Sequence, residues 1–150
     1  MQIMVNVARI RTLPDDIENL AERAHWEGYR FIRRLIDEFE SGANAFTHPG
    51  EALFEVRILG KLVGIAGLNI DPYVSGGSVG RVRRMYVHPG HRNHGIGTAL
   101  IEAIEKHARG SFDLLQLRTD SDAASRFYAS VGFVPLHGAA EASHAKRLRD

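Results

Sequence analysis

The six residues from Arg92 to Gly97 have the types and the order that could bind a phosphate group. They precede a helical pattern, where the first backbone N–H groups of the helix have no partner and the helix dipole is positive. Thr98 adds a hydroxyl one step into that helix. A turn of this kind commonly binds phosphate. Gly95 and Gly97 would allow a ligand close to the backbone, although they equally suit a tight turn that binds nothing.

The local charge supports an anion at this turn. No carboxylate occurs between Asp71 and Glu102, and this stretch contains four arginines and three histidines: Arg81, Arg83, Arg84, Arg92, His88, His91 and His94. In a chain whose formal net charge is +1, this is a local excess of positive charge that indicates an anionic ligand. The histidines at every third position do not favour a metal site, because the helix dipole there opposes a cation. We therefore expect no bound metal.

The composition is that of one ordinary globular domain, and we expect a single domain over residues 1–150. Hydrophobic residues make up 44% of the chain and charged residues 25%. The 19 basic and 18 acidic side chains are too evenly balanced for a nucleic-acid partner. The absence of cysteine excludes disulfides and thiolate chemistry. No apolar run reaches the ~20 residues of a membrane span, so we expect no membrane partner and a cytoplasmic location.

The spacing of apolar residues predicts which elements hold the turn. The predicted strands are Ile3–Ile10, Leu53–Ile58, Leu62–Ile70, Val79–Val87, Phe112–Leu117, Phe133–Leu136 and Ser143–Leu148. The predicted helices are Leu13–His25, a helix between Gly28 and Gly42, Gly95–Arg109, and a helix between Ser121 and Gly132. Thr12 and Asp15 form the start signal of the first helix. This order predicts an α/β (α+β) fold with a mixed, mostly antiparallel sheet flanked by helices.

Two segments together resemble the GNAT superfamily of N-acetyltransferases. Residues 85–101 match its R/Q-x-x-G-x-G/A signature, and residues 121–136 match its later helix, with Ala124, Tyr128 and a Gly-Phe pair. The predicted order of elements agrees along nearly the whole chain. The resemblance implies a V-shaped splay between the two central strands, into which acetyl-CoA fits in place of a missing strand.

The resemblance also implies the cofactor contacts. Backbone groups of Met85, Tyr86 and Val87 would pair with the pantetheine arm and polarise the thioester carbonyl. Backbone N–H groups of Arg92, Asn93, His94, Gly95, Ile96 and Gly97, with Thr98, would hold the pyrophosphate. Ser121 and Tyr128 would also contact the cofactor. Tyr128 corresponds to the usual general acid that protonates the departing thiolate, although a core aromatic would occupy the same helix face.

The general base has no assignment from the sequence. Many members of the superfamily have Glu four residues before the position of Met85, where this chain has Arg81. Asp71, Glu55, His88 and a water relay remain alternatives for deprotonating the amine.

For the acceptor we expect a primary amine of a small molecule or peptide, contacted by Trp26, Tyr29, Asp71 and Tyr73. The predicted function is N-acetyl transfer from acetyl-CoA by direct attack in a ternary complex. Two alternatives stay open: a non-catalytic acyl-CoA-binding or sensor domain of the same fold, and transfer of longer acyl groups or to an oxygen acceptor. A homodimer is possible, since superfamily members often pair.

Overall fold

The computed structural model describes residues 5–148 and contains the predicted elements in the predicted order. The strands are β1 (Val7–Ile10), β2 (Ala52–Ile58), β3 (Lys61–Ile70), β4 (Val79–Val87), β5 (Leu114–Leu117), β6 (Val134–Pro135) and β7 (His144–Arg147). The helices are α1 (Ile17–Trp26), α2 (Phe31–Ser41), α3 (Ile96–Ala108) and α4 (Asp122–Ser130), with a short 3-10 turn, η1, at Pro89–His91.

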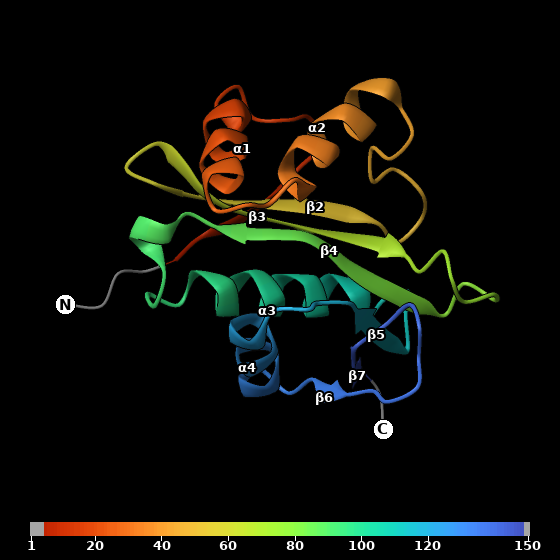
Figure 1. Cartoon of the computed structure of the whole chain (residues 1–150). Coiled ribbons are helices and arrows are strands. Elements are labelled where there is room, and N and C mark those ends of the chain that lie inside the picture. Colours follow the sequence, from red (N-terminus) through yellow and green to blue (C-terminus); the bar gives the residue numbers. More distant parts are fainter. Residues whose placement is uncertain (1–4, 149–150) are drawn as a thin grey trace.

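The strands form one sheet in the order β1-β2-β3-β4-β5-β7-β6. All neighbouring strands are antiparallel except β4 and β5. Helices α1 and α2 cover one face of the sheet, and α3 and α4 lie on the other (Figure 1). The mixed, mostly antiparallel fold predicted from the sequence is therefore confirmed.

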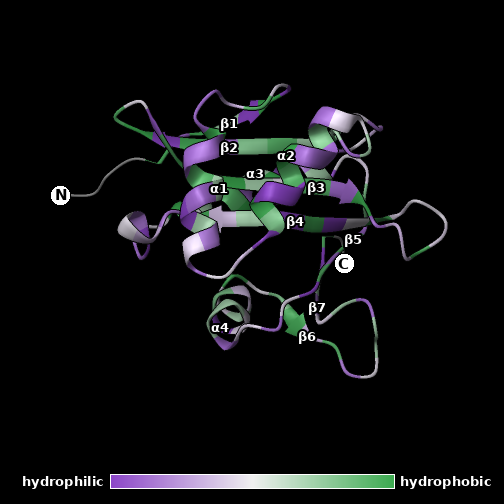
Figure 2. Ribbon diagram, turned by 45° about the horizontal axis from the view of Figure 1, so that its top comes forward, coloured by the Kyte–Doolittle hydropathy of each residue, from purple (hydrophilic) through white to green (hydrophobic). Residues whose placement is uncertain are grey.

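Each face of the sheet has its own apolar core. The α1/α2 side buries residues such as Leu20, Ile36 and Ile65. The α3/α4 side buries a larger set that includes Leu100, Ile104 and Phe112. Seen from the α1/α2 side, the outward turns of those helices are largely hydrophilic, while β2 beneath them is hydrophobic (Figure 2). The sheet is thus held rigidly from both sides.

Strands β4 and β5 separate soon after they meet. Their parallel pairing covers Val79↔Leu114, Gly80↔Leu115 and Arg81↔Gln116. Beyond Arg81, β4 continues to Val87 with β3 as its hydrogen-bonded neighbour and an open edge on the other side. This is the V-shaped splay predicted between the central strands.

A bulge bends β4 within its unpaired half. The register with β3 shifts between Ile65↔Tyr86 and Gly67↔Arg83, so β4 has one extra residue there. Arg84 lies in this bulge and has a positive φ of 57°, a conformation that L residues rarely adopt. Bulges turn a strand and redirect its side chains. The result is that Met85 and Tyr86 still pack on opposite faces of the sheet.

Several predicted element boundaries were wrong. The first helix begins at Ile17 rather than Leu13, because the Asp16 carboxylate accepts hydrogen bonds from Arg57 and from the Leu62 backbone instead of capping an earlier turn. The fifth strand starts at Leu114, and the two C-terminal strands are shorter than predicted. Ile3 and Met4 of the predicted first strand lie outside the described residues. Among the helices of residues 5–148, none combines the length and hydropathy that a bilayer crossing demands.

Candidate active site

A large cleft of about 1080 Å³ opens where β4 and β5 separate. Its walls come from the end of β4, the N-terminus of α3, the segment after β5, the start of α4 and the region from the α1–α2 connection into α2. The lining includes these residues predicted to bind the cofactor: Met85, Tyr86, Val87, Arg92, Asn93, Gly95, Ile96, Gly97, Thr98, Ser121 and Tyr128. His94, also predicted, is exposed and does not line the cleft.

The turn before α3 presents unpaired backbone donors. Gly95 is the N-cap of α3 with φ of 82°, and no side chain caps this end. Asn93 also has a positive φ, of 65°. Within residues 5–148, Ala99 donates the first helical hydrogen bond, to the Gly95 carbonyl. The preceding N–H groups, from Ile96 to Thr98, therefore point out of the helix with its positive dipole end, as an anion site requires.

Glycine at position 97 lets Phe127 and Met85 pack closely against the start of α3. A Cβ at Gly97 would lie 3.1 Å from the Phe127 ring and 3.2 Å from the Met85 methyl group. Both of these side chains line the cleft. At Gly95, by contrast, a Cβ would meet nothing within 4 Å, and the positive φ explains the glycine. The residues present thus fit a narrow ligand arm ending in a phosphate group.

The open edge of β4 suits that arm. Backbone groups of Met85 to Val87 face the cleft on the side that β5 leaves unpaired. An extended amide chain can pair with such an edge as a strand would.

Tyr128 is buried between the core and the cleft. It packs against Phe127, Phe133 and His144, and its hydroxyl donates to the Met85 sulfur at 3.4 Å. Burial raises the pKa of the Tyr128 hydroxyl above its ordinary value, so the group holds its proton throughout the neutral range. The residue therefore belongs to the core and also lines the cleft, and its role as general acid stays a prediction. The Ser121 hydroxyl is already used as the N-cap of α4, accepting from Ala124 N at 3.2 Å.

A network that sequence reasoning missed ties the α1–α2 connection to the phosphate-type turn. Arg92 donates to both oxygens of Glu27, at 2.7 and 2.8 Å, and to the Val87 carbonyl at 3.0 Å. The Tyr86 hydroxyl donates to the same Glu27 carboxylate. The Arg92 hydrogen bonds hold the pKa of Glu27 below its usual range, whereas burial and Glu27 raise the pKa of Tyr86. The sequence pattern gave no indication of this contact, because 65 residues separate Glu27 from Arg92.

None of the three side-chain alternatives for the general base lines the cleft. Asp71 is fully buried and ion-paired with Arg81 at 3.2 Å. Glu55 is ion-paired with Arg57 at 2.9 Å. His88 accepts a hydrogen bond from Gly90 N, and burial lowers its pKa. Arg81, at the vertex of the V, also donates to the Glu141 carbonyl, so a paired cation occupies the position at which many superfamily members have Glu.

The predicted acceptor contacts are dispersed. Tyr29 lines the cleft, at its entrance beside Phe31. Trp26 is 75% exposed and lines a separate hollow of about 290 Å³ with His88. The Tyr73 ring centre lies 4.9 Å from the Arg81 guanidinium. Neither Tyr73 nor Asp71 lines the cleft. Acceptor roles for Trp26, Asp71 and Tyr73 stay predictions.

The structure adds wall residues that the sequence motifs did not indicate, notably Phe31 and Arg34 on α2 and Thr119 after β5. The i, i+3 spacing of Phe31 and Arg34 places them on one helix face and could have indicated a shared wall. Within residues 5–148, no three His, Asp or Glu side chains gather as metal ligands would.

Comparison with known proteins gives partial matches to curated proteins and matches over nearly the whole chain to solved structures. The aminoglycoside N(6')-acetyltransferase type 1 of Klebsiella aerogenes is 40% identical over 78 residues, covering 50% of this chain and 50% of that protein. The N-alpha-acetyltransferase RimI of Mycobacterium tuberculosis is 37% identical over 78 residues, covering 49% and 46%. The matched segment thus spans about half the length of each relative.

A crystal structure from Exiguobacterium sp. 255-15, of a protein considered an acetyltransferase, superimposes with a TM-score of 0.85 at 27% identity. The match covers 97% of this chain and 94% of that one. The model of the acetyltransferase (GNAT) family matches residues 14–133, which include the splayed strands, the α3 turn and α4. The chain therefore belongs to the GNAT acetyltransferase family.

Proposed function

We propose that the protein transfers an acetyl group from acetyl-CoA to a primary amine of a small molecule or peptide, in one step within a ternary complex. The observation that carries the proposal is the cleft itself. It joins uncapped helical N–H groups, an unpaired strand edge and a buried tyrosine hydroxyl in one space. Family membership supports the same activity.

The residues have separate roles in this proposal. N–H groups at the start of α3, around Gly95 and Gly97, bind the pyrophosphate. The backbone of Met85 to Val87 pairs with the pantetheine arm and polarises the thioester carbonyl. Acetyl-CoA supplies an activated acetyl thioester, so transfer exchanges a carbon–sulfur bond for a carbon–nitrogen bond and leaves free coenzyme A thiol. Tyr128 gives its hydroxyl proton to the departing sulfur. The attacking nitrogen releases a proton to solvent as the amide forms, and Tyr128 regains one from solvent.

The carboxylate at the vertex of the V, Asp71, is not free to deprotonate the amine, since it is held by Arg81. We propose that the amine loses its proton to water before attack. Its rate would then follow the fraction of free amine, which rises with pH toward the pKa of the amine. The proposal includes a cytoplasmic location and leaves room for a homodimer.

The test is release of free thiol from acetyl-CoA with a panel of amines, alongside thermal unfolding with coenzyme A and acetyl-CoA. We expect both ligands to raise the unfolding temperature by mass action and at least one amine class to give turnover. Binding of both ligands without turnover on any amine would favour the sensor alternative. No binding would contradict the proposed site altogether.

A further inference from the structure

Arginines gather on one side of the cleft, away from the phosphate-type turn. The lining contains Arg34, Arg81, Arg83, Arg84 and Arg118. Three of them are engaged: Arg81 with Asp71, Arg84 with Glu38 and Arg118 with the Ala140 carbonyl. The side chains of Arg34 and Arg83 have no hydrogen-bond or ion-pair partner within residues 5–148. Asp120 also lines the cleft, 3.9 Å from Arg118, so Arg34 and Arg83 are left without a paired counter-charge within residues 5–148.

Arg83 is the more telling of the two because it is half-buried on β4. Burial, with the neighbouring charges of Arg84 and Arg81, lowers the pKa of its guanidinium. A half-buried cation with cationic neighbours is costly unless a ligand pairs with it.

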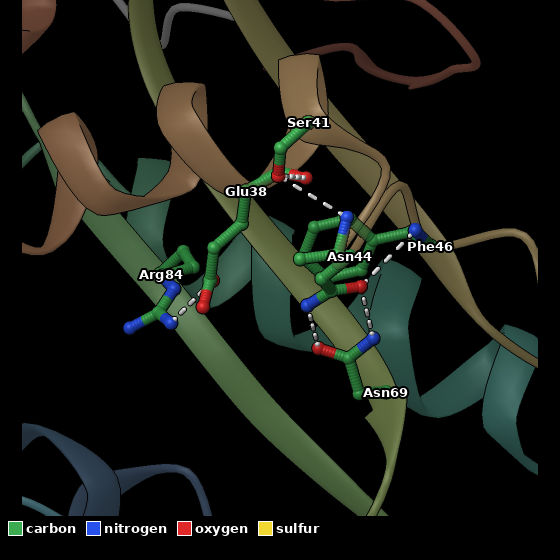
Figure 3. Close-up of polar contacts among 7 residues, drawn as sticks. Glu38, Ser41, Asn44, Phe46, Asn69 and Arg84 are labelled. Atoms are coloured by element: carbon green, nitrogen blue, oxygen red, sulfur yellow. Dashed lines mark hydrogen bonds and ion pairs between the residues drawn. The ribbon is translucent and has the colours of Figure 1, made fainter.

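Arg84 provides a second, independent observation. Its side chain is 10% exposed, and one guanidinium nitrogen donates to Glu38 of α2 at 2.8 Å (Figure 3). Its Nε is buried without a hydrogen-bond partner in the described part of the chain. Buried donors are nearly always satisfied, so this unpaired Nε, on a residue that lines the cleft, is a donor still open to an acceptor.

The position of these groups separates them from the phosphates of the cofactor. Arg83 lies four residues before Val87, ~13 Å along an extended strand, and the phosphate-type turn begins farther on at Arg92. Helix α2 forms the wall here: Phe31, Arg34 and Glu38 follow at i, i+3 and i+7 on one face. Contacts of Arg83 and Arg34 are therefore available to the second substrate.

We propose that the acceptor is an amine that also carries a carboxylate, either a free amino acid or a peptide with an acidic N-terminal residue, and that Arg83 and Arg34 bind this carboxylate with the Arg84 Nε as a further donor. This inference rests on the proposed acetyl transfer. Guanidinium groups bind carboxylates with planar, charge-assisted hydrogen bonds. The same positive field disfavours the protonated amine, which helps in a cleft whose lining includes neither Asp71 nor Glu55. Polycationic acceptors are repelled.

The experiment compares acceptors that differ in the carboxylate alone. Thiol release from acetyl-CoA is measured with alanine against alaninamide, with Asp-Ala-Ala amide against Asn-Ala-Ala amide, and with spermidine. The first pair tests free amino acids and the second tests peptides. Each acceptor is assayed with the parent chain, Arg83→Gln, Arg83→Lys and the control Arg11→Gln, which removes an exposed arginine that does not line the cleft.

We expect kcat/KM to be about tenfold or more higher for the acid in at least one pair, the range of a charge-assisted hydrogen bond. Arg83→Gln should raise the acceptor KM about tenfold for that acid, with kcat and the KM of acetyl-CoA little changed. Arg83→Lys should keep part of the preference, and Arg11→Gln all of it.

Equal rates for acid and amide in both pairs, or a preference for spermidine, would overturn the inference while leaving acetyl transfer established. So would an Arg83→Gln variant that slows every acceptor equally or raises the KM of acetyl-CoA instead. If no amine releases thiol, the proposed function fails and the inference fails with it.

Discussion

The Asp71 carboxylate lies 3.2 Å from a guanidinium nitrogen of Arg81, with both side chains buried, at the last residue pair that joins β4 to β5. The opposite charges of the two side chains cancel at the vertex of the V. Its Arg81 also holds the Glu141 carbonyl, so the ion pair links β4 to the segment before β7.

Breaking this pair should unfold the protein more easily. Asp71→Asn leaves a buried guanidinium without its counter-charge, which costs about 3 kcal/mol of unfolding free energy. Urea unfolding measures the loss. The double variant Asp71→Asn with Arg81→Met should recover most of it, because no charge then remains buried. A single variant as stable as the parent would show that solvent reaches the vertex.

Removing the Tyr128 hydroxyl should slow acetyl transfer without disturbing the cofactor site. Tyr128→Phe retains the ring that packs on Phe133 and removes the proton donor beside Met85. We expect kcat to fall about a hundredfold, the lower range for general acid–base catalysis, with little change in the Kd of acetyl-CoA. Steady-state kinetics and calorimetric binding check the two quantities. An unchanged kcat would assign Tyr128 to the core alone.

The buried tyrosines should make the fold sensitive to alkali. The pKa of Tyr128 is raised in the folded state above the value of about 10 in the unfolded chain, so the folded state keeps its proton longer. Its contribution is complete below pH ~10 and is lost as pH rises above that value. Urea midpoints from pH 8 to 11 should fall more steeply for the parent than for Tyr128→Phe. Parallel curves would contradict this.

A methyl group at position 97 should impair ligand binding. In Gly97→Ala the new Cβ requires Phe127 and Met85, which both line the cleft, to shift by a few tenths of an ångström. We expect the Kd of coenzyme A to rise severalfold, while helix propensity offsets the cost to folding. Gly110→Ala is the matched control, since its Cβ makes an ordinary contact at 3.7 Å. Equal affinity in both variants would show that the cleft floor can adjust.

The Glu27–Arg92 contact should contribute modestly to stability. Both side chains are partly exposed, so solvent screens the pair. A double-mutant cycle of Glu27→Gln and Arg92→Gln should give a coupling of about 1 kcal/mol, measured by urea unfolding. A coupling near zero would leave the hydrogen bond from the Tyr86 hydroxyl as the main stabilising contact of Glu27.

What the sequence could predict followed from local patterns. The order of elements and the turn at Gly95 depend on residues close together in the sequence. The resemblance to the family rests on two such local segments. The tertiary contacts did not have a local signal. Arg81 looked like a substitution at a catalytic position, and its pairing with Asp71 required the β3–β4 register. Likewise, Trp26 was predicted to contact the acceptor from its position between the first two helices. It faces solvent, because α1 buries its apolar stripe of Leu20 and Ala24.

The short β4–β5 pairing has one more consequence. Within residues 5–148, three backbone pairs are the sheet's sole ladder between its amino-terminal four strands and its carboxy-terminal three. Beyond these pairs the two blocks are joined through side chains, such as Leu100 and Leu115 in the shared apolar core and Arg81 on the Glu141 carbonyl. Amide hydrogen exchange at Leu114 to Gln116 would report how often the junction opens. A molecule bound along the gap between β4 and β5 would close it by pairing with the open edge of β4.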